Sequence, residues 1–131
     1  MLVSARISFG GRGAPAGLLI AWFEGYFDLI VSEELLGELK RVLLRPKFRG
    51  YTTPEETVEY VNLLRRMATL EPEPPVPSES FTPDPKDDYL VALARSSGAN
   101  FLISGDPHLT GIIDPRPPVL SPRAFLEMVK P

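Results

Sequence analysis

Three aspartates crowd the start of one predicted helix, and a fourth follows the apolar run that comes after it. In the stretch DPKDDYLVALARSSGANFLISGD they are Asp84, Asp87, Asp88 and Asp106. Carboxylates set against apolar segments either cap helices or hold a cation, because an ionised carboxylate loses its solvation there unless a donor or a cation compensates. The position of each acid relative to the predicted elements separates these two roles.

Capping accounts for the first two aspartates. Asp84 precedes a proline, the usual pairing of an N-cap with a first helical residue, and Asp87 lies in the first turn, where the helix dipole favours an acid. Asp88 stands one position further along, and its neighbours one turn on, Val91 and Ala92, belong to the buried side of the helix. We therefore expect Asp88 to have a functional role.

Two further acids are placed where parallel sheets hold ligands. Asp106 comes just past the carboxyl end of the strand predicted at 100–104, although it fits equally well as an N-cap. Glu38 lies on the helix that starts at the carboxyl end of the strand predicted at 27–31; taken alone, it favours an exposed pair with the arginine three residues on. Ser104 ends its strand and can hydrogen-bond a carboxylate or simply finish the strand.

The coincidence of these acids at one sheet edge favours a metal site. Glu38, Asp88 and Asp106 all follow or border that edge, and the chain has no cysteine. Carboxylate oxygens without thiolates select Mg²⁺ or Mn²⁺ over zinc. His108, the single histidine, sits in a turn and is expected to be exposed.

Length and composition predict one domain over residues 1–131. The chain has 131 residues with 44% hydrophobic content, enough for one core and too few for two ordinary domains. The lack of cysteine excludes a disulfide framework and fits a reducing compartment, with the cytoplasm as the expected location. No apolar run approaches the roughly 20 residues of a membrane span, and no export signal is readable, so we expect no membrane association.

A net charge of −3 argues against a protein that coats nucleic acid through bulk electrostatics. It does not argue against a nuclease, which gathers acids in its site and confines basic residues to a local track. One basic cluster is present, formed by Arg41, Arg45, Lys47 and Arg49. The simpler interpretation of this cluster is a solvated helix end.

The hydrophobic pattern predicts strands separated by helices, which indicates an α/β sandwich with a parallel sheet. Ser32, Thr53, Asp84 and Ser121 are the predicted N-caps. The chain from 71 to 85 is predicted to be a surface connection. Helices are expected at 2–9, 16–25, 33–46, 54–70, 85–97 and 122–129, with a short one after 105, and strands at 27–31, 100–104 and 118–120.

Four segments in this order carry a resemblance to a known family. They are LVSARIS followed by GG, FDLIVSEELLGELKRVLLRPKF, DPKDDYLVALARSSGANFLISGDPHL, and VLSPRAFLEM. Together they cover nearly the whole chain and resemble the PIN-domain family, in particular its toxin components of toxin–antitoxin systems.

The resemblance implies a three-layer α/β sandwich and a ribonuclease that uses acids to hold Mg²⁺ or Mn²⁺. It matches Glu38 to the family's helix acid, Asp88 to the acid before the x-x-x-Ala helix, and Asp106 to the acid after a strand that ends in threonine or serine. Ser104 then corresponds to the supporting hydroxyl. The implied partners are single-stranded RNA, a cognate antitoxin and a second copy of the chain in a homodimer.

One departure from the family pattern bears on activity. Family members begin with a hydrophobic strand ending in Asp-x-Asn, whereas Met1 stands where the next segment is already under way. We therefore expect the first central strand and its aspartate to be missing, leaving a gap in the sheet or a repair by a partner chain, and cleavage to be impaired. The alternative is a non-catalytic PIN-like module that binds an antitoxin or partner protomer; a haloacid-type hydrolase ranks lower, because it needs a nucleophilic aspartate after that strand.

Overall fold

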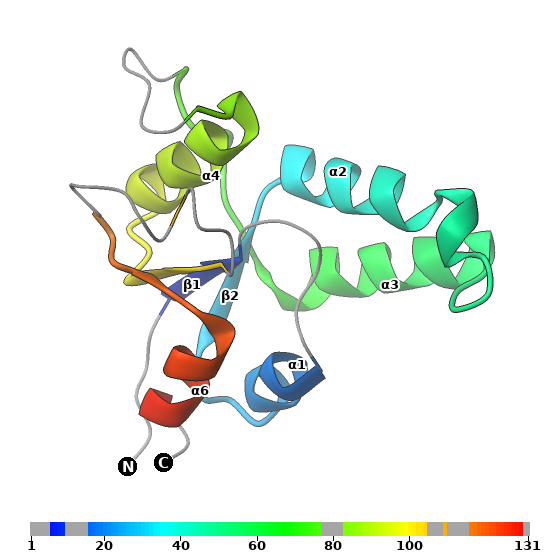
Figure 1. Cartoon of the computed structure of the whole chain (residues 1–131), viewed down its shortest axis with the longest axis horizontal. Coiled ribbons are helices and arrows are strands. Elements are labelled where there is room, and N and C mark those ends of the chain that lie inside the picture. The colour runs from blue at the N-terminus through cyan, green and yellow to red at the C-terminus, as the bar shows by residue number, and fades with distance from the viewer. Residues whose placement is uncertain (1–5, 10–15, 77–82, 105–108, 110–115, 130–131) are drawn as a thin grey trace.

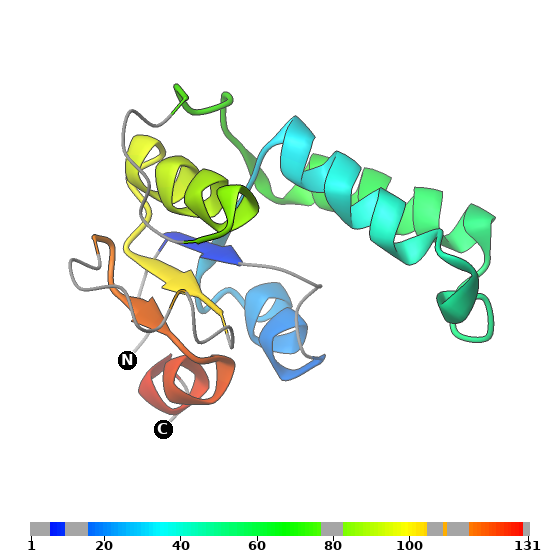
Figure 2. The same ribbon diagram turned by 45° about the horizontal axis from the view of Figure 1, so that its top comes forward.

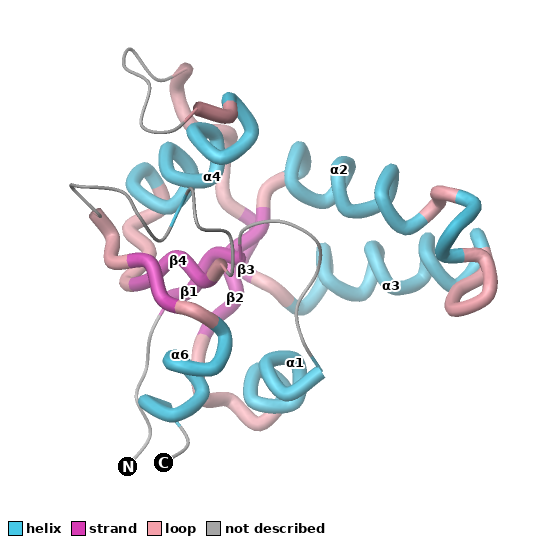
Figure 3. The backbone as a smooth tube through the Cα atoms, viewed as in Figure 1, coloured by secondary structure: helices cyan, strands magenta, loops and turns pink. Residues whose placement is uncertain are grey.

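A sheet of five parallel strands forms the centre of the computed structural model (Figures 1 and 3). The structure describes residues 6–9, 16–76, 83–104, 109 and 116–129. The strands lie in the order β3-β2-β1-β4-β5. Their bounds are Arg6–Phe9 for β1, Asp28–Val31 for β2, Thr69–Leu70 for β3, Phe101–Ile103 for β4 and Val119–Leu120 for β5.

Helices cover both faces of this sheet, which confirms the predicted α/β sandwich. Helix α4 lies over one face and contacts β1 and β4, whereas α1 and α6 pack together on the other (Figure 1). Helices α2 and α3 pack side by side and project away from the sheet (Figure 2); we call this pair, residues 33–67, the arm. The helix bounds are Ala16–Phe23 for α1, Glu33–Leu43 for α2, Pro54–Met67 for α3, Pro85–Ser96 for α4 and Pro122–Val129 for α6, with a 3-10 turn at Pro46–Phe48.

Side-chain caps start the helices where the sequence places them. The Ser32 hydroxyl accepts a hydrogen bond from the Leu35 backbone N–H at 3.1 Å, and Asp84 accepts one from the Lys86 N–H at 2.9 Å. Thr53 and Glu56 form a reciprocal capping box. These local bonds fix the first residues of α2, α3 and α4, and so the direction in which each helix leaves its loop.

The core consists of two layers separated by the sheet. On β4, Leu102 packs into the layer beneath α4 with Leu90 and Ala94, whereas Ile103 packs into the layer on the opposite face with Phe125. Successive strand residues point to opposite faces, so a short strand buried on both sides supplies both layers. This explains why the residues of β4, Phe101–Ile103, are all apolar.

The prediction of a helix at 2–9 is wrong for residues 6–9, the part that the structure describes, and the prediction of an unfilled centre in the sheet is wrong as well. Residues 6–9 form β1, which pairs with β2 through Ile7 and Leu29 and with β4 through Ile7 and Phe101. RISF alternates polar and apolar residues, a period typical of a strand. The central position therefore needs no partner chain. Strand β3, which extends the sheet past β2, was also not expected from the sequence.

Helix α3 buries only a narrow stripe of its apolar residues. Val61 and Leu64 are buried, but Val58 is 40% exposed and Met67 is 54% exposed, and Thr57 is buried in their place. The arm projects from the body, so α3 has α2 as its main packing partner and only a narrow face of it is covered.

Replacing Phe125 with alanine tests the core described above. Phe125 is fully buried and its ring contacts Phe27 and Phe101. We expect Phe125→Ala to lower the free energy of unfolding by about 3–5 kcal/mol in urea denaturation, because truncation of a buried ring leaves a cavity. Phe23→Ala is the matched control, since Phe23 is 55% exposed; a loss as large as that of Phe125→Ala would contradict this packing.

Candidate functional site

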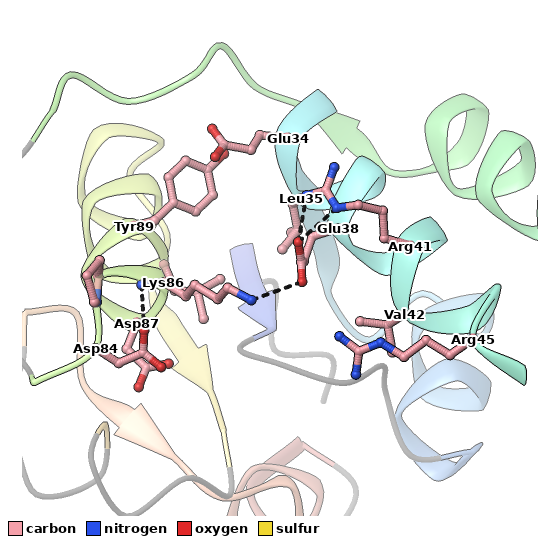
Figure 4. Close-up of a pocket in the computed structure, with 12 residues that line it drawn as sticks. Glu34, Leu35, Glu38, Arg41, Val42, Arg45, Asp84, Lys86, Asp87 and Tyr89 are labelled. Atoms are coloured by element: carbon pink, nitrogen blue, oxygen red, sulfur yellow. Dashed lines mark hydrogen bonds and ion pairs between the residues drawn. The ribbon is translucent and has the colours of Figure 1, made fainter. Parts of the chain in front are cut away.

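A cleft of about 570 Å³ lies between α2 and α4 (Figure 4). Helix α2 forms one wall and the first two turns of α4 form the other. Acids, bases and apolar side chains share its surface. The lining residues are Glu34, Leu35, Glu38, Arg41, Val42 and Arg45 from α2, and Asp84, Pro85, Lys86, Asp87, Tyr89 and Leu90 from α4 and its cap.

The sheet topology explains why the cleft forms at this edge. Helix α2 begins directly after the carboxyl end of β2, and α4 begins at the same edge because it returns antiparallel to the strands before β4. From β1 the chain moves to β2 on one side, whereas from β4 it moves to β5 on the other. Open parallel sheets bind ligands outside the carboxyl ends of the strands at such a reversal.

Glu38 extends from α2 into this cleft and pairs with two cations. Its Oε2 accepts hydrogen bonds from Arg41 Nη2 at 2.6 Å and Nε at 3.2 Å, and its Oε1 lies 3.5 Å from Lys86 Nζ on the opposite wall (Figure 4). The hydrogen bonds from Arg41 are the largest effect and lower the pKa of Glu38; burial opposes them, and the nearby charges of Lys86 and Arg41 lower the pKa further. Glu38 is therefore an ionised carboxylate whose charge is shared by two helices.

Asp87 is the acid that α4 buries beside the cleft. Asp87 is only 8% exposed and lines the cleft. Asp84 caps the helix, as expected. The sequence analysis gave Asp87 a capping role and missed this placement. The signal was present: Leu90, Val91 and Ala94 follow Asp87 at three, four and seven residues, and all are buried.

The other predicted site residues have different positions. Asp88 lies in the first turn of α4, is half-buried, and is not among the residues that line the cleft. Ser104, just after β4, is 3% exposed. Asp106 and His108 fall outside the described residues. The structure thus brings Glu38 and Asp87 to one cleft and leaves Asp88 out of it.

The chemistry of the cleft suits a hard divalent cation in part. Its acids offer carboxylate oxygens, the donors that Mg²⁺ and Mn²⁺ prefer, and the chain contains no thiolate donor. Within the portion of the chain that the structure describes, no three acidic or histidine side chains gather closely enough to hold a metal ion. The described acids of the cleft therefore do not by themselves make up a metal site.

A hydrogen-bond chain joins the two walls of the cleft. The Tyr89 hydroxyl of α4 lies 2.6 Å from the Ser32 hydroxyl at the cap of α2, and it donates to Glu73 Oε1. Since Tyr89 has one hydroxyl proton, Ser32 is the donor between those two hydroxyls. Glu73 Oε2 also accepts from the Glu34 N–H at 3.1 Å. Burial, together with the hydrogen bond to Glu73, holds the pKa of Tyr89 above its ordinary value, so the phenol keeps its proton.

A sequence model of the PIN domain matches residues 1–108, most of the chain. The chain belongs to the PIN domain family. PIN domains are in general nucleases that act on RNA and depend on divalent metal ions. No curated protein sequence matches the chain. Among the described residues of this PIN domain, no helix is both long enough and apolar enough to cross a membrane.

Removing the Tyr89 hydroxyl tests the link between the walls. Tyr89→Phe should lower the free energy of unfolding by about 1 kcal/mol in urea denaturation, because the Ser32 and Glu73 groups lose a shared partner. Tyr51→Phe serves as the matched control, since Tyr51 is 87% exposed. Equal stability of Tyr89→Phe and the unaltered chain would show that this hydrogen-bond chain does not fix the walls.

Proposed function

We propose that this PIN domain is a metal-dependent ribonuclease that cleaves single-stranded RNA, and that its activity is impaired in this chain. The observation that supports this proposal is the cleft at the carboxyl edge of the sheet, where Glu38 of α2 and the buried Asp87 of α4 lie with three cationic side chains. The toxin role, a cognate antitoxin, a homodimer and a cytoplasmic location belong to the same proposal and rest on the resemblance and on the absence of cysteine.

Mg²⁺ or Mn²⁺ would be held by Glu38 and Asp87, with Asp106 as the further acid that the sequence offers and Ser104 as a supporting hydroxyl. Asp88 is the alternative to Asp87 as the acid from α4. When bound, such an ion supplies Lewis acidity, which acidifies water and neutralises negative charge on a phosphodiester. The hydrogen bonds from Arg41 and the charge of Lys86 next to Glu38 keep its carboxylate ionised.

The remaining cleft residues bind and orient the substrate. Arg41, Arg45 and Lys86 place cationic groups at the cleft, where they attract the phosphates of RNA. Leu35, Val42 and Leu90 add apolar wall that limits the access of water. Single-stranded RNA suits this shape, because its backbone can bend into a recess that a stiff duplex enters poorly.

Impairment is expected from two features of the cleft. Strand β1, RISF, occupies the centre of the sheet and carries no acid, so this strand supplies no carboxylate to the ligand set. Glu38 is already paired with Arg41 and Lys86, which a metal ion must displace or share. Both features weaken divalent-ion binding and slow cleavage.

Cleavage of labelled single-stranded RNA in Mn²⁺ tests the proposal. We expect slow cleavage by the unaltered chain and a further loss of about 100-fold in Asp87→Asn, which removes a carboxylate charge from the cleft and preserves the side chain's shape. Asp88→Asn is the matched control on the next residue and should have a much smaller effect, because Asp88 does not line the cleft.

Two results would contradict the proposal as stated. Equal cleavage by the unaltered chain and Asp87→Asn would exclude Asp87 from the site. A larger loss in Asp88→Asn than in Asp87→Asn would move the α4 acid of the site to Asp88.

A non-catalytic PIN module is the second candidate function. The ion pairs of Glu38 favour it, because they satisfy the carboxylate without a metal ion. Such a module would bind an antitoxin or a partner protomer, show no metal-dependent cleavage, and keep that binding in Asp87→Asn.

A further inference from the structure

Part of the positive charge of this acidic chain gathers along α2 and at the outer end of the arm. Between residues 39 and 54 the chain has no acid and carries five of its 14 basic residues, although the net charge of the whole chain is −3. They are Lys40, Arg41, Arg45, Lys47 and Arg49. Charges of one sign repel each other, so their collection on a net-negative chain indicates an anionic ligand.

The last of these side chains lie exposed around the turn that joins α2 to α3. We call Arg45, Lys47, Arg49 and Tyr51 the basic tip. All four are exposed, and Tyr51 is 87% exposed, the second most exposed of the large hydrophobic side chains described. Among the described residues, none of the three cations forms an ion pair with an acid, in contrast to Arg65 and Arg123, which pair with glutamates.

The basic tip continues directly from the cleft. Arg41 and Arg45 stand one helical turn apart on α2 and both line the cleft (Figure 4). Beyond Arg45 the 3-10 turn at Pro46–Phe48 leads to the rest of the tip, and Lys47 Nζ lies 5.2 Å from the centre of the Phe48 ring. Cations therefore follow one another along the chain from the cleft to the outer end of the arm.

We propose that the basic tip binds the strand of single-stranded RNA that enters or leaves the cleft, with Arg45, Lys47 and Arg49 on its phosphates and Tyr51 stacked on a base. This inference rests on the proposed function, because it takes the cleft as the place where the same strand is cut. Arginine forks match phosphate oxygens, and an exposed aromatic ring beside cations provides the stacking surface that single strands use.

RNA fits this surface better than an acidic protein does. A protein partner would need an apolar centre to bind stably, whereas the only large apolar group of the tip is the phenol of Tyr51 and the rest is cationic. The continuity with a cleft of nuclease type also places the tip on the path of the RNA backbone.

Fluorescence anisotropy of a short labelled single-stranded RNA, measured in EDTA over a series of salt concentrations, tests the inference. Lys47→Gln with Arg49→Gln should weaken binding about tenfold and reduce the slope of log K against log salt by about 1.4, because each lost phosphate contact removes about 0.7. Tyr51→Ala should weaken binding about tenfold with little change of that slope.

Arg66→Gln with Arg123→Gln is the matched control. It removes the same charge from two exposed sites distant from the basic tip: Arg66 lies at the end of α3 opposite the tip, and Arg123 lies on α6. This double variant should leave the affinity within about twofold and the slope unchanged. Thermal melting of each variant verifies the fold. Equal losses of RNA affinity in the two double variants would show bulk electrostatics only and would overturn the inference. Unchanged RNA binding in Lys47→Gln with Arg49→Gln would also overturn it, and would leave an acidic polypeptide as the ligand of the tip.

Binding in EDTA separates this inference from the proposed function. Tip-dependent RNA binding without cleavage in Mn²⁺ would support the tip and reject the nuclease activity. Cleavage that depends on Asp87 together with tip-independent binding would reject the tip alone.

Discussion

The cleft exists because the carboxyl ends of parallel strands meet at one edge, and a hydrogen bond at that edge joins its two walls. Ser32 directly follows β2 and caps α2, and its hydroxyl contacts that of Tyr89 in the second turn of α4, 57 residues later in the chain. Glu73 lies in the connection between α3 and α4, and it accepts hydrogen bonds from Glu34 of α2 and Tyr89 of α4. The separation of Glu38 from Asp87 depends on this contact, since each acid is carried by one of the two helices.

Charge is arranged around the cleft in two zones of opposite sign. The inner zone holds Glu38 and the buried Asp87, and the outer zone is the series of cations from Arg41 to the basic tip. Lys86 and Arg41 bridge the zones by pairing with Glu38. A polyanionic substrate is attracted by the outer zone, whereas a divalent cation is attracted by the inner one, and a metal-dependent nuclease needs both.

Local chemistry made much of the fold predictable. Ser32, Thr53, Asp84 and Ser121 all cap helices as expected, because a side-chain oxygen at a helix start acts within a few residues. The strands at 28–31 and 101–103 followed from apolar runs with turns on either side. Parallel pairing followed from the helices between them.

What the sequence did not predict depends on contacts distant in the chain. Two segments, residues 6–9 and Thr69–Leu70, are too short for their local sequence to distinguish strand from helix. Residues 6–9 become a strand by pairing with β2 and β4, and Thr69–Leu70 by pairing with β2. Asp87 was taken for a cap because an acid in a first turn usually is one. Asp87 is buried because α4 packs on the sheet, and it lines the cleft because α2 lies nearby. The spacing of apolar residues along α4 would have indicated the burial, but not the cleft.

The most direct test of the central claim is a Mn²⁺ titration of the chain beside Asp87→Asn, in which the electron paramagnetic resonance signal reports the free ion. The account predicts weak binding, with a dissociation constant above about 100 μM, and at least a tenfold further loss in the variant, because it proposes Glu38 and Asp87 as only two members of a larger ligand set. An affinity for Mn²⁺ that Asp87→Asn leaves unchanged would contradict it.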